Sequence, residues 1–144
     1  MAQVDFYILS DESGLDPLRY GARLIDKVYH LGMSLFALLP DQQSAELFSE
    51  GLWNLSDDSF LAHDLGEPKT GARLCVGWSP PGEQQYQVLL NLAGSIPSFH
   101  DRFERIAEIV PANTEARDQC RRNYRAYQEK GYALKTHNIG SPSR

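Results

Sequence analysis

The 144-residue sequence contains no apolar run that approaches the roughly 20 residues a transmembrane helix needs. Its first ten residues lack the basic region of a signal peptide and enter a strand-like pattern at once. Cysteine is scarce, and the sequence contains only Cys75 and Cys120. Neither of them belongs to a CxxC pair. We therefore expect no contact with a membrane and two buried free thiols in a reducing cytoplasm.

Motifs for nucleotides, metals and nucleophilic catalysis are also missing. Neither GxGxxG nor GxxxxGK[ST] occurs, and Lys69-Thr70, which resembles the end of the second, follows Pro68 instead of glycine. The four histidines show no metal-ligand spacing. No GxSxG elbow is present, and neither cysteine has the setting of an activated nucleophile. These absences predict no cofactor, no metal and no catalytic residues, so we do not expect an enzyme.

Acidic side chains occupy the places where an α/β protein would hold a phosphate. The first expected strand-to-helix turn carries Asp11, Glu12 and Asp16, which would repel a phosphate. A second acidic pair, Asp57-Asp58, has no basic or histidine neighbour in sequence and is typical of a solvated loop or a helix cap. The first stretch therefore argues against a nucleotide-binding site, and the second is not expected to be a paired-carboxylate catalytic site.

The net charge of −5 is unevenly distributed. Residues 1–100 carry 5 basic and 13 acidic side chains, hence −8, whereas residues 101–144 carry 9 basic and 6 acidic, hence +3. An acidic body repels a nucleic-acid backbone, so we do not expect direct DNA binding by the whole surface. The basic C-terminal part instead favours a local acidic partner, such as a peptide.

Strand-like and helix-like segments alternate through the first third of the chain. This alternation predicts right-handed crossovers and a largely parallel sheet within one domain over residues 1–139. The expected strands are Val4–Leu9 and Ser34–Leu39, and the expected helices run from Pro17, after an Asp16 cap, to Gly32 and from an Asp41 cap to Trp53.

The second half is less regular. The SPPGEQQ turn between 73–78 and 86–93 is short, so we predict that these two strands form an antiparallel hairpin. Other expected segments are a strand or extended segment at 59–63, a strand at 105–110, an extended tail at 134–139 and a flexible end at 140–144.

A helix is predicted over residues 113–132, with Asn113 or Thr114 as its N-cap and Gly131 at its end. Ala116, Cys120 and Tyr127 share an apolar stripe. A basic stripe lies beside it, with Tyr124 on the border, and consists of Arg117, Arg121 and Arg125. Two interpretations stay open here: an ordinary solvated face, or a site for a ligand that is both acidic and apolar.

Three segments together resemble the chi subunit of bacterial DNA polymerase III. They are VDFYIL at 4–9, LWNLSDDSFLAHDL at 52–65 and RNYRAYQEKGY at 122–132. Their order and spacing both fit the family across nearly the whole chain. The resemblance implies a Rossmann-like three-layer α/β/α sandwich without nucleotide chemistry.

The resemblance also implies partners and a site. Members of that family are non-catalytic accessory subunits of the clamp loader in the bacterial cytoplasm, where DNA is reached only indirectly. One surface binds the psi subunit, and another binds the acidic, phenylalanine-ended tail of single-stranded-DNA-binding protein. The tail-binding residues carry over onto Trp53, Phe60, Arg117, Arg121, Tyr124 and Arg125.

Other functions are compatible with the residues. Trp53 and Phe60 are large aromatic side chains, which belong to the core more often than to a contact surface. The chain could also be a small α/β enzyme or nucleotide-binding domain whose site is assembled from scattered loops. A third possibility is a scaffold that binds psi alone, with the basic helix merely solvated.

Overall fold

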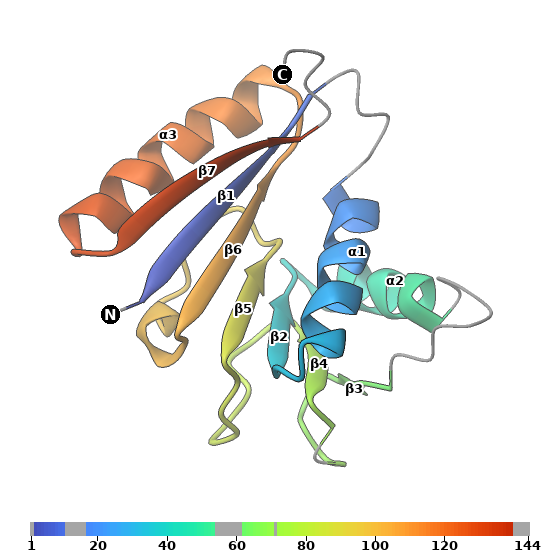
Figure 1. Ribbon diagram of the computed structural model, residues 1–144. Coiled ribbons are helices and arrows are strands. Elements are labelled where there is room, and N and C mark those ends of the chain that lie inside the picture. The colour runs from blue at the N-terminus through green and yellow to red at the C-terminus, as the bar shows by residue number, and fades with distance from the viewer. Residues whose placement is uncertain (1, 11–16, 54–61, 71, 140–144) are drawn as a thin grey trace.

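The computed structural model describes residues 2–10, 17–53, 62–70 and 72–139, and within them the chain forms a three-layer α/β/α sandwich (Figure 1). Seven strands form one sheet in the order β3-β4-β2-β5-β6-β1-β7, and all described pairs are parallel. The strands are β1 (Gln3–Leu9), β2 (Leu35–Leu38), β3 (Asp64–Leu65), β4 (Leu74–Gly77), β5 (Val88–Asn91), β6 (Arg105–Val110) and β7 (Ala133–Ile139). The helices are α1 (Pro17–His30), α2 (Gln42–Trp53) and α3 (Thr114–Glu129), with a short 3-10 turn at His100–Arg102. None of the described helices is long and apolar enough to cross a membrane.

Side-chain alternation along the strands creates a core on each face of the sheet. On one face, Leu35 and Ala37 of β2 pack with Ile25 of α1 and Phe48 of α2. The other core lies under α3, where the buried side chains include Phe6, Phe36, Ile106 and Tyr127. Each fully buried large apolar side chain contributes about 1.5–3 kcal/mol. Because both faces of the sheet are buried, these strands appear in the sequence as continuous apolar runs.

Local capping signals set the helix ends that the sequence predicts. The Asp41 carboxylate accepts a hydrogen bond from the Ser44 amide at 2.8 Å, and the Asn113 side chain accepts one from the Ala116 amide at 2.8 Å. Gly131 follows α3 with a φ of 91°, a conformation that glycine adopts without strain. The caps at Asp41 and Asn113 are therefore confirmed, whereas Asp16 lies outside the described residues.

The predicted antiparallel hairpin is wrong. Strands β4 and β5 do not pair with each other, because β2 lies between them and both run parallel to it. The connection over residues 78–87 returns along the sheet on the α3 side, where Tyr86 packs against Phe36 with ring centroids 5.8 Å apart. Strands of four residues span only about 13 Å. Even this short connection can therefore run from the end of β4 back to the edge of the sheet at which both β4 and β5 begin.

The predicted extended tail is a full strand of the sheet. Strand β7 pairs with β1 in parallel from Gln3 opposite Ala133 to Leu9 opposite Ile139. The unit β6-α3-β7 thus crosses over β1, which places β1 between β6 and β7. Most of the strand or extended segment predicted at 59–63 lies outside the described residues, as does the predicted flexible end at 140–144.

Both cysteines are free thiols as predicted, but the prediction that both are buried holds only for Cys75. Cys75 is fully buried, and burial raises the pKa of its thiol to about 12. Cys120 is only half-buried on α3, and burial raises the pKa of its thiol as well. Both groups therefore stay protonated at neutral pH, and the structure gives neither of them an activating environment.

Candidate functional site

The most prominent charged feature of α3 is the basic ridge, defined as Arg117, Arg121 and Arg125. All three side chains are exposed, because a spacing of four residues keeps them on one side of a helix whose opposite side is buried. The structure therefore brings together the three arginines that were predicted as site residues.

The guanidinium groups of the basic ridge are held loosely. Arg121 is 74% exposed and donates to the Asp118 carboxylate at 2.7 Å, one turn away on the same helix. Arg117 reaches back to the carbonyl of Leu9 at the end of β1, at a distance of 3.4 Å. Exposed ion pairs of this kind contribute little stability. A carboxylate from a ligand can therefore replace Asp118 at Arg121 at small cost.

Tyr124 lies where the sequence predicts, between the basic ridge and the apolar side of α3. Its half-buried ring rests on Phe6 of β1, with centroids 5.4 Å apart. Leu134 of β7 packs against the same core. Neither Phe6 nor Leu134 was predicted beside the site, because residues 134–139 were expected to form only an extended tail. The alternation within VDFYIL was the one available signal for Phe6.

A buried polar network fastens α3 to the sheet. The Tyr127 hydroxyl donates to Glu108 Oε2 at 2.6 Å, and Asn91 Nδ2 donates to the same oxygen at 2.8 Å. Tyr127 is fully buried. Burial raises the pKa of the Glu108 carboxyl from its ordinary 4.5 to about 7, although the bonds from Tyr127 and Asn91 act in the opposite direction. This network positions the helix that carries the basic ridge.

The Glu108 carboxyl makes stability depend on pH. Its raised pKa means that folding takes up a proton between about pH 4.5 and pH 7. The stabilising contribution is therefore complete below pH 4.5 and is lost as the pH rises to about 7. We expect the free energy of unfolding to be lower at pH 8 than at pH 5, by about 1 kcal/mol or more.

Urea unfolding at these two pH values tests this expectation in the wild-type chain and in Glu108→Gln. Glutamine still accepts the bonds from Tyr127 and Asn91 but carries no charge, so the variant should lose most of the pH dependence. An equal pH dependence in both proteins would contradict the assignment to Glu108. Asp5, whose pKa is lowered, affects stability only as the pH falls below its ordinary 3.8, outside this window.

Trp53 is the last residue of α2 and is 46% exposed. Its ring lies against His63, with centroids 4.6 Å apart, and His63 Nε2 is 2.7 Å from the Ser49 hydroxyl. Because α2 and α3 cover opposite faces of the sheet, Trp53 belongs to a different face from the basic ridge (Figure 1). Phe60 lies outside the described residues. The structure thus groups four of the six predicted site residues, all on α3.

A cavity of about 830 Å³ opens on the other flank of α3, at the carboxyl ends of β5 and β6. Parallel α/β sheets often bind ligands at this edge. The described residues that line the cavity include three carboxylates and one cation, namely Glu108, Glu115, Asp118 and Arg122. Such a lining disfavours a phosphate.

Two other candidate places for a cofactor are the Lys69-Thr70 pair and any cluster of metal-ligating side chains. Residue Thr70 of the Lys69-Thr70 pair donates its hydroxyl to the Asp64 carboxylate at 3.0 Å, so these side chains hold the loop. The described residues contain no group of three or more histidine, cysteine, aspartate or glutamate side chains placed to hold a metal ion.

Comparisons with known proteins identify the family of this chain. Residues 1–135 match the model of the family described as "DNA polymerase III chi subunit, HolC". The DNA polymerase III subunit chi of Pseudomonas aeruginosa is 29% identical over 139 residues, which cover 96% of this chain and 98% of that protein. The subunit chi of Escherichia coli is 26% identical over 143 residues, covering 94% and 97%, and that of Haemophilus influenzae is 26% identical over 138 residues, covering 94% and 96%. The chain therefore belongs to the DNA polymerase III chi subunit family.

Proposed function

We propose that this protein is a non-catalytic accessory subunit of the bacterial replicative polymerase in the cytoplasm. It joins the psi subunit of the clamp loader to the acidic, phenylalanine-ended tail of single-stranded-DNA-binding protein. The observation that carries the tail-binding part is the basic ridge, exposed beside the half-buried Tyr124 on a helix that a buried network fixes to the sheet. Family membership supports the assignment to DNA polymerase III.

The tail ends in a carboxylate next to an aromatic ring, and the basic ridge with Tyr124 offers a group for each. In the proposal, Arg121 exchanges Asp118 for the terminal carboxylate and binds it through two parallel hydrogen bonds. The ring of Tyr124 contacts the terminal phenylalanine. Arg117 and Arg125 attract the aspartates of the tail over longer distances. Trp53 and Phe60 remain predicted contacts of the tail, but Trp53 lies across the sheet from the basic ridge and would have to contact another part of the tail.

A peptide titration tests this function. A fluorescent peptide with several aspartates and a terminal phenylalanine should bind the wild-type chain, as measured by anisotropy. The same peptide with an amidated C-terminus, or with alanine in place of the last residue, should bind much more weakly. Equal affinity for all three peptides would contradict the proposal, because it would leave only unspecific charge attraction.

Arg117→Ala is expected to weaken peptide binding at low salt and to have little effect at about 0.3 M salt. The physical reason is that exposed charges further apart than the Debye length, about 10 Å at 0.1 M salt, are largely screened. Anisotropy titrations at two salt concentrations give the measurement. Arg122→Ala is the matched control, because Arg122 is an arginine of the same helix that points to Gln119 on the opposite flank. An equal loss in both variants would contradict a specific role of Arg117.

A small nucleotide-binding domain is the alternative function, and the cavity beside α3 is its best location. Thermal unfolding with ATP, GTP or the acidic peptide separates the two functions, because a ligand stabilises the folded chain by RT ln(1 + [L]/Kd). We expect stabilisation by the peptide only. Stabilisation by a nucleotide alone would overturn the proposed function. A chain that binds psi but not the peptide would instead be a scaffold for psi.

A further inference from the structure

Strands β1 and β6 are neighbours in the sheet, but the helices that follow them lie on opposite faces. Helix α1 follows β1 on one face, and α3 follows β6 on the other (Figure 1). A divergence of this kind opens a crevice at the carboxyl edge of a parallel sheet, where α/β proteins often bind small ligands. The cavity of about 830 Å³ lies at this place, and we call it the crevice cavity.

The crevice cavity lies between the first turn of α1 and the first turns of α3. Leu18 lines it from α1, and Ala116 lines it from α3. The other apolar side chains of the lining come from the sheet and its connections, namely Phe6, Leu92, Ile109, Val110 and Pro111. A volume of this size and a largely apolar lining with a few polar groups are typical of a small-molecule site.

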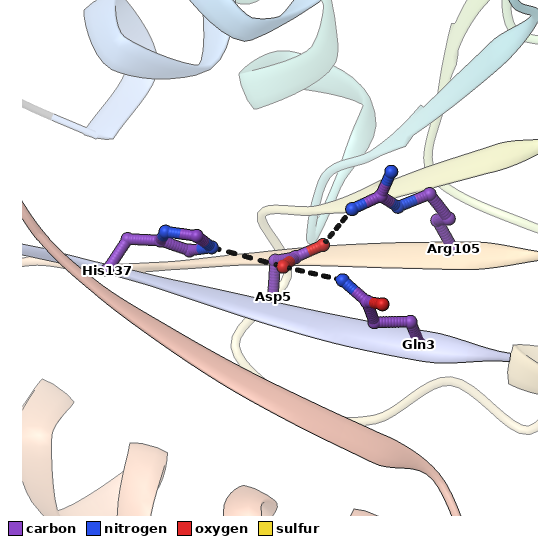
Figure 2. A network of polar contacts seen from close by, with 4 residues as sticks. All are labelled: Gln3, Asp5, Arg105 and His137. Atoms are coloured by element: carbon purple, nitrogen blue, oxygen red, sulfur yellow. Dashed lines mark hydrogen bonds and ion pairs between the residues drawn. The ribbon is translucent and has the colours of Figure 1, made fainter.

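Two carboxyl groups are buried in the neighbouring strands β1 and β6, and they differ in the donors that they meet. Asp5 of β1 is 4% exposed, and Arg105 donates to its Oδ2 at 3.0 Å. Gln3 donates to Oδ1 at 3.0 Å, and His137 Nε2 lies 3.1 Å from the same oxygen; Figure 2 shows these four side chains. Burial alone would raise the pKa of Asp5, but the bonds from His137, Arg105 and Gln3 hold it below its ordinary value. Asp5 is therefore fully matched.

Glu108 of β6 is 5% exposed and lines the crevice cavity. Tyr127 and Asn91 both donate to Oε2, and no donor among the described residues reaches Oε1. No lysine, arginine or histidine in the described part of the chain forms an ion pair with Glu108. Burial accordingly raises the pKa of this carboxyl to about 7. Glu108 thus lacks the cation that Arg105 gives to Asp5, and Oε1 is left for a ligand in the cavity.

The charges around the crevice cavity also favour a cation. Glu115 and Asp118 line it from α3, and Arg122 is the one cationic residue among its described lining residues. Arg122 is already engaged, because it donates to Gln119 at 2.8 Å. Glu115 lies in the first turn of α3, where a carboxylate compensates the partial positive charge of the helix end. With Glu108, three carboxylates of the lining would attract a cationic ligand.

The single available oxygen selects the kind of cation. A guanidinium binds best when both oxygens of a carboxylate accept in parallel, but Glu108 Oε2 already accepts from two donors. An ammonium is a compact charge with three donors, so it can use Oε1 alone. The apolar lining requires that this ammonium is carried on an apolar body.

We propose that the crevice cavity is a binding site for a small primary amine with an apolar body, whose ammonium group donates to Glu108 Oε1. The body of the ligand packs against Phe6, Val110 and Leu18. The ligand gives Glu108 the positive charge that Arg105 gives to Asp5. This site lies on the flank of α3 away from the basic ridge, and it does not depend on the proposed function.

The probe for the site is phenylbutylamine. Phenylbutanol and phenylbutanoate are its controls, because they keep the apolar skeleton and change only the polar end. Amide shifts in NMR spectra of the isotope-labelled full chain, in phosphate buffer without a competing amine, give the affinity and the location. We expect the amine to bind at least tenfold more tightly than either control and to shift the amides of Gly94, Glu108 and Ala116, while those of Arg121 and Arg125 stay in place.

Two results of this titration would overturn the proposal. One is the absence of saturable shifts at the cavity residues up to about 10 mM amine, a weak limit for a ligand of this size. The other is binding of the alcohol or the carboxylate as tightly as the amine, because the ammonium would then contribute nothing. Failure of the acidic peptide to bind would overturn the proposed function and leave this site intact.

Glu108→Gln should weaken binding of the amine at least tenfold, because it removes the charge but still accepts the bonds from Tyr127 and Asn91. Glu129→Gln is the matched control, since it removes an exposed carboxylate at the other end of α3, and it should change the affinity less than twofold. Thermal unfolding verifies that each variant is folded. Equal affinity of the two variants would overturn the role of Glu108.

A second pair of variants avoids the buried position. Leu18 lines the cavity and is 41% exposed, so Leu18→Arg places a cation at its mouth without disturbing the core. This variant should weaken amine binding at least threefold. Leu47→Arg adds the same charge on α2, where Leu47 is 60% exposed, and should leave the affinity unchanged. An equal effect of both variants would show unspecific repulsion and contradict binding in the cavity.

The amine should bind more tightly at pH 8 than at pH 6, by up to about tenfold, because a carboxyl with a pKa of about 7 is mostly protonated at pH 6. Tyr127 and Cys120 of α3 face Glu108, and burial raises the pKa of both, so they stay neutral over this range. Phe6 of β1 and Asn91 of β5, the neighbours of Glu108 in the sheet, do not titrate. The carboxylates of α3 that line the cavity are Glu115 and Asp118. Glu108→Gln should lose this pH dependence, and an equal dependence in the variant would overturn the contact with Glu108.

Discussion

Arg121→Ala is expected to weaken binding of the acidic, phenylalanine-ended peptide by about 2 kcal/mol or more, which corresponds to about 30-fold in Kd. The physical reason is that the terminal carboxylate would lose its bidentate partner and stay partly desolvated. Loss of the bond between Arg121 and Asp118 should cost the free chain little, because both side chains are well exposed. Fluorescence anisotropy gives the affinity, and thermal unfolding verifies the fold.

A double-mutant cycle makes this test specific. If Arg121 binds the terminal carboxylate, amidation of the peptide and Arg121→Ala remove the same interaction, so their effects should not add. Arg122→Ala serves as the control and should leave the effect of amidation intact. Additive losses from Arg121→Ala and amidation would show that the carboxylate binds elsewhere.

Tyr127→Ala is expected to lower the free energy of unfolding by about 3–5 kcal/mol, the range for truncating a large buried aromatic side chain. Tyr127 is fully buried, its ring makes an edge contact with Phe6 at 6.1 Å, and its hydroxyl donates to Glu108. The variant leaves a cavity under α3 and deprives the buried carboxyl of a donor. Denaturant unfolding followed by circular dichroism gives the measurement.

Tyr127→Phe separates the two contributions. It keeps the ring and removes only the hydroxyl, so it should cost about 1–3 kcal/mol, the range for leaving a buried acceptor without its donor. If Tyr127→Phe cost as much as Tyr127→Ala, the hydrogen bond to Glu108 would outweigh the packing, contrary to our expectation. Because the ring still supports α3, Tyr127→Phe should retain peptide affinity within about twofold, well inside the tenfold that 1.4 kcal/mol represents.

The side chains of Arg121 and Tyr127 act at different places. Arg121 contacts the proposed ligand, whereas Tyr127 holds the helix that carries Arg121. Arg121→Ala should weaken peptide binding and leave the free energy of unfolding nearly unchanged. Tyr127→Phe should lower the free energy of unfolding and leave peptide affinity nearly unchanged while the chain stays folded. The pair therefore distinguishes a binding residue from a structural one within a single helix.

Features that depend on near neighbours in the chain were predictable from the residues. The cap at Asn113, the exposed basic ridge and the half-buried Tyr124 all follow from contacts three or four positions apart. The strand at 105–110 was predictable from its β-branched residues, and the start of α2 from the Asp41 cap. Such signals are local, so they can be recognised in the sequence without knowledge of the fold.

Features that depend on which strands become neighbours were decided by the tertiary structure. The place of β2 between β4 and β5, and the entry of residues 133–139 into the sheet beside β1, depend on burying both faces of the sheet, and no short motif encodes that. Glu108 and Tyr127 are 19 residues apart, and Asp5 and His137 are 132 apart. The buried anchor of α3 and the polar network around Asp5 therefore arise only when parallel strands are laid side by side, because side chains far apart in the chain share a face only after the register is set.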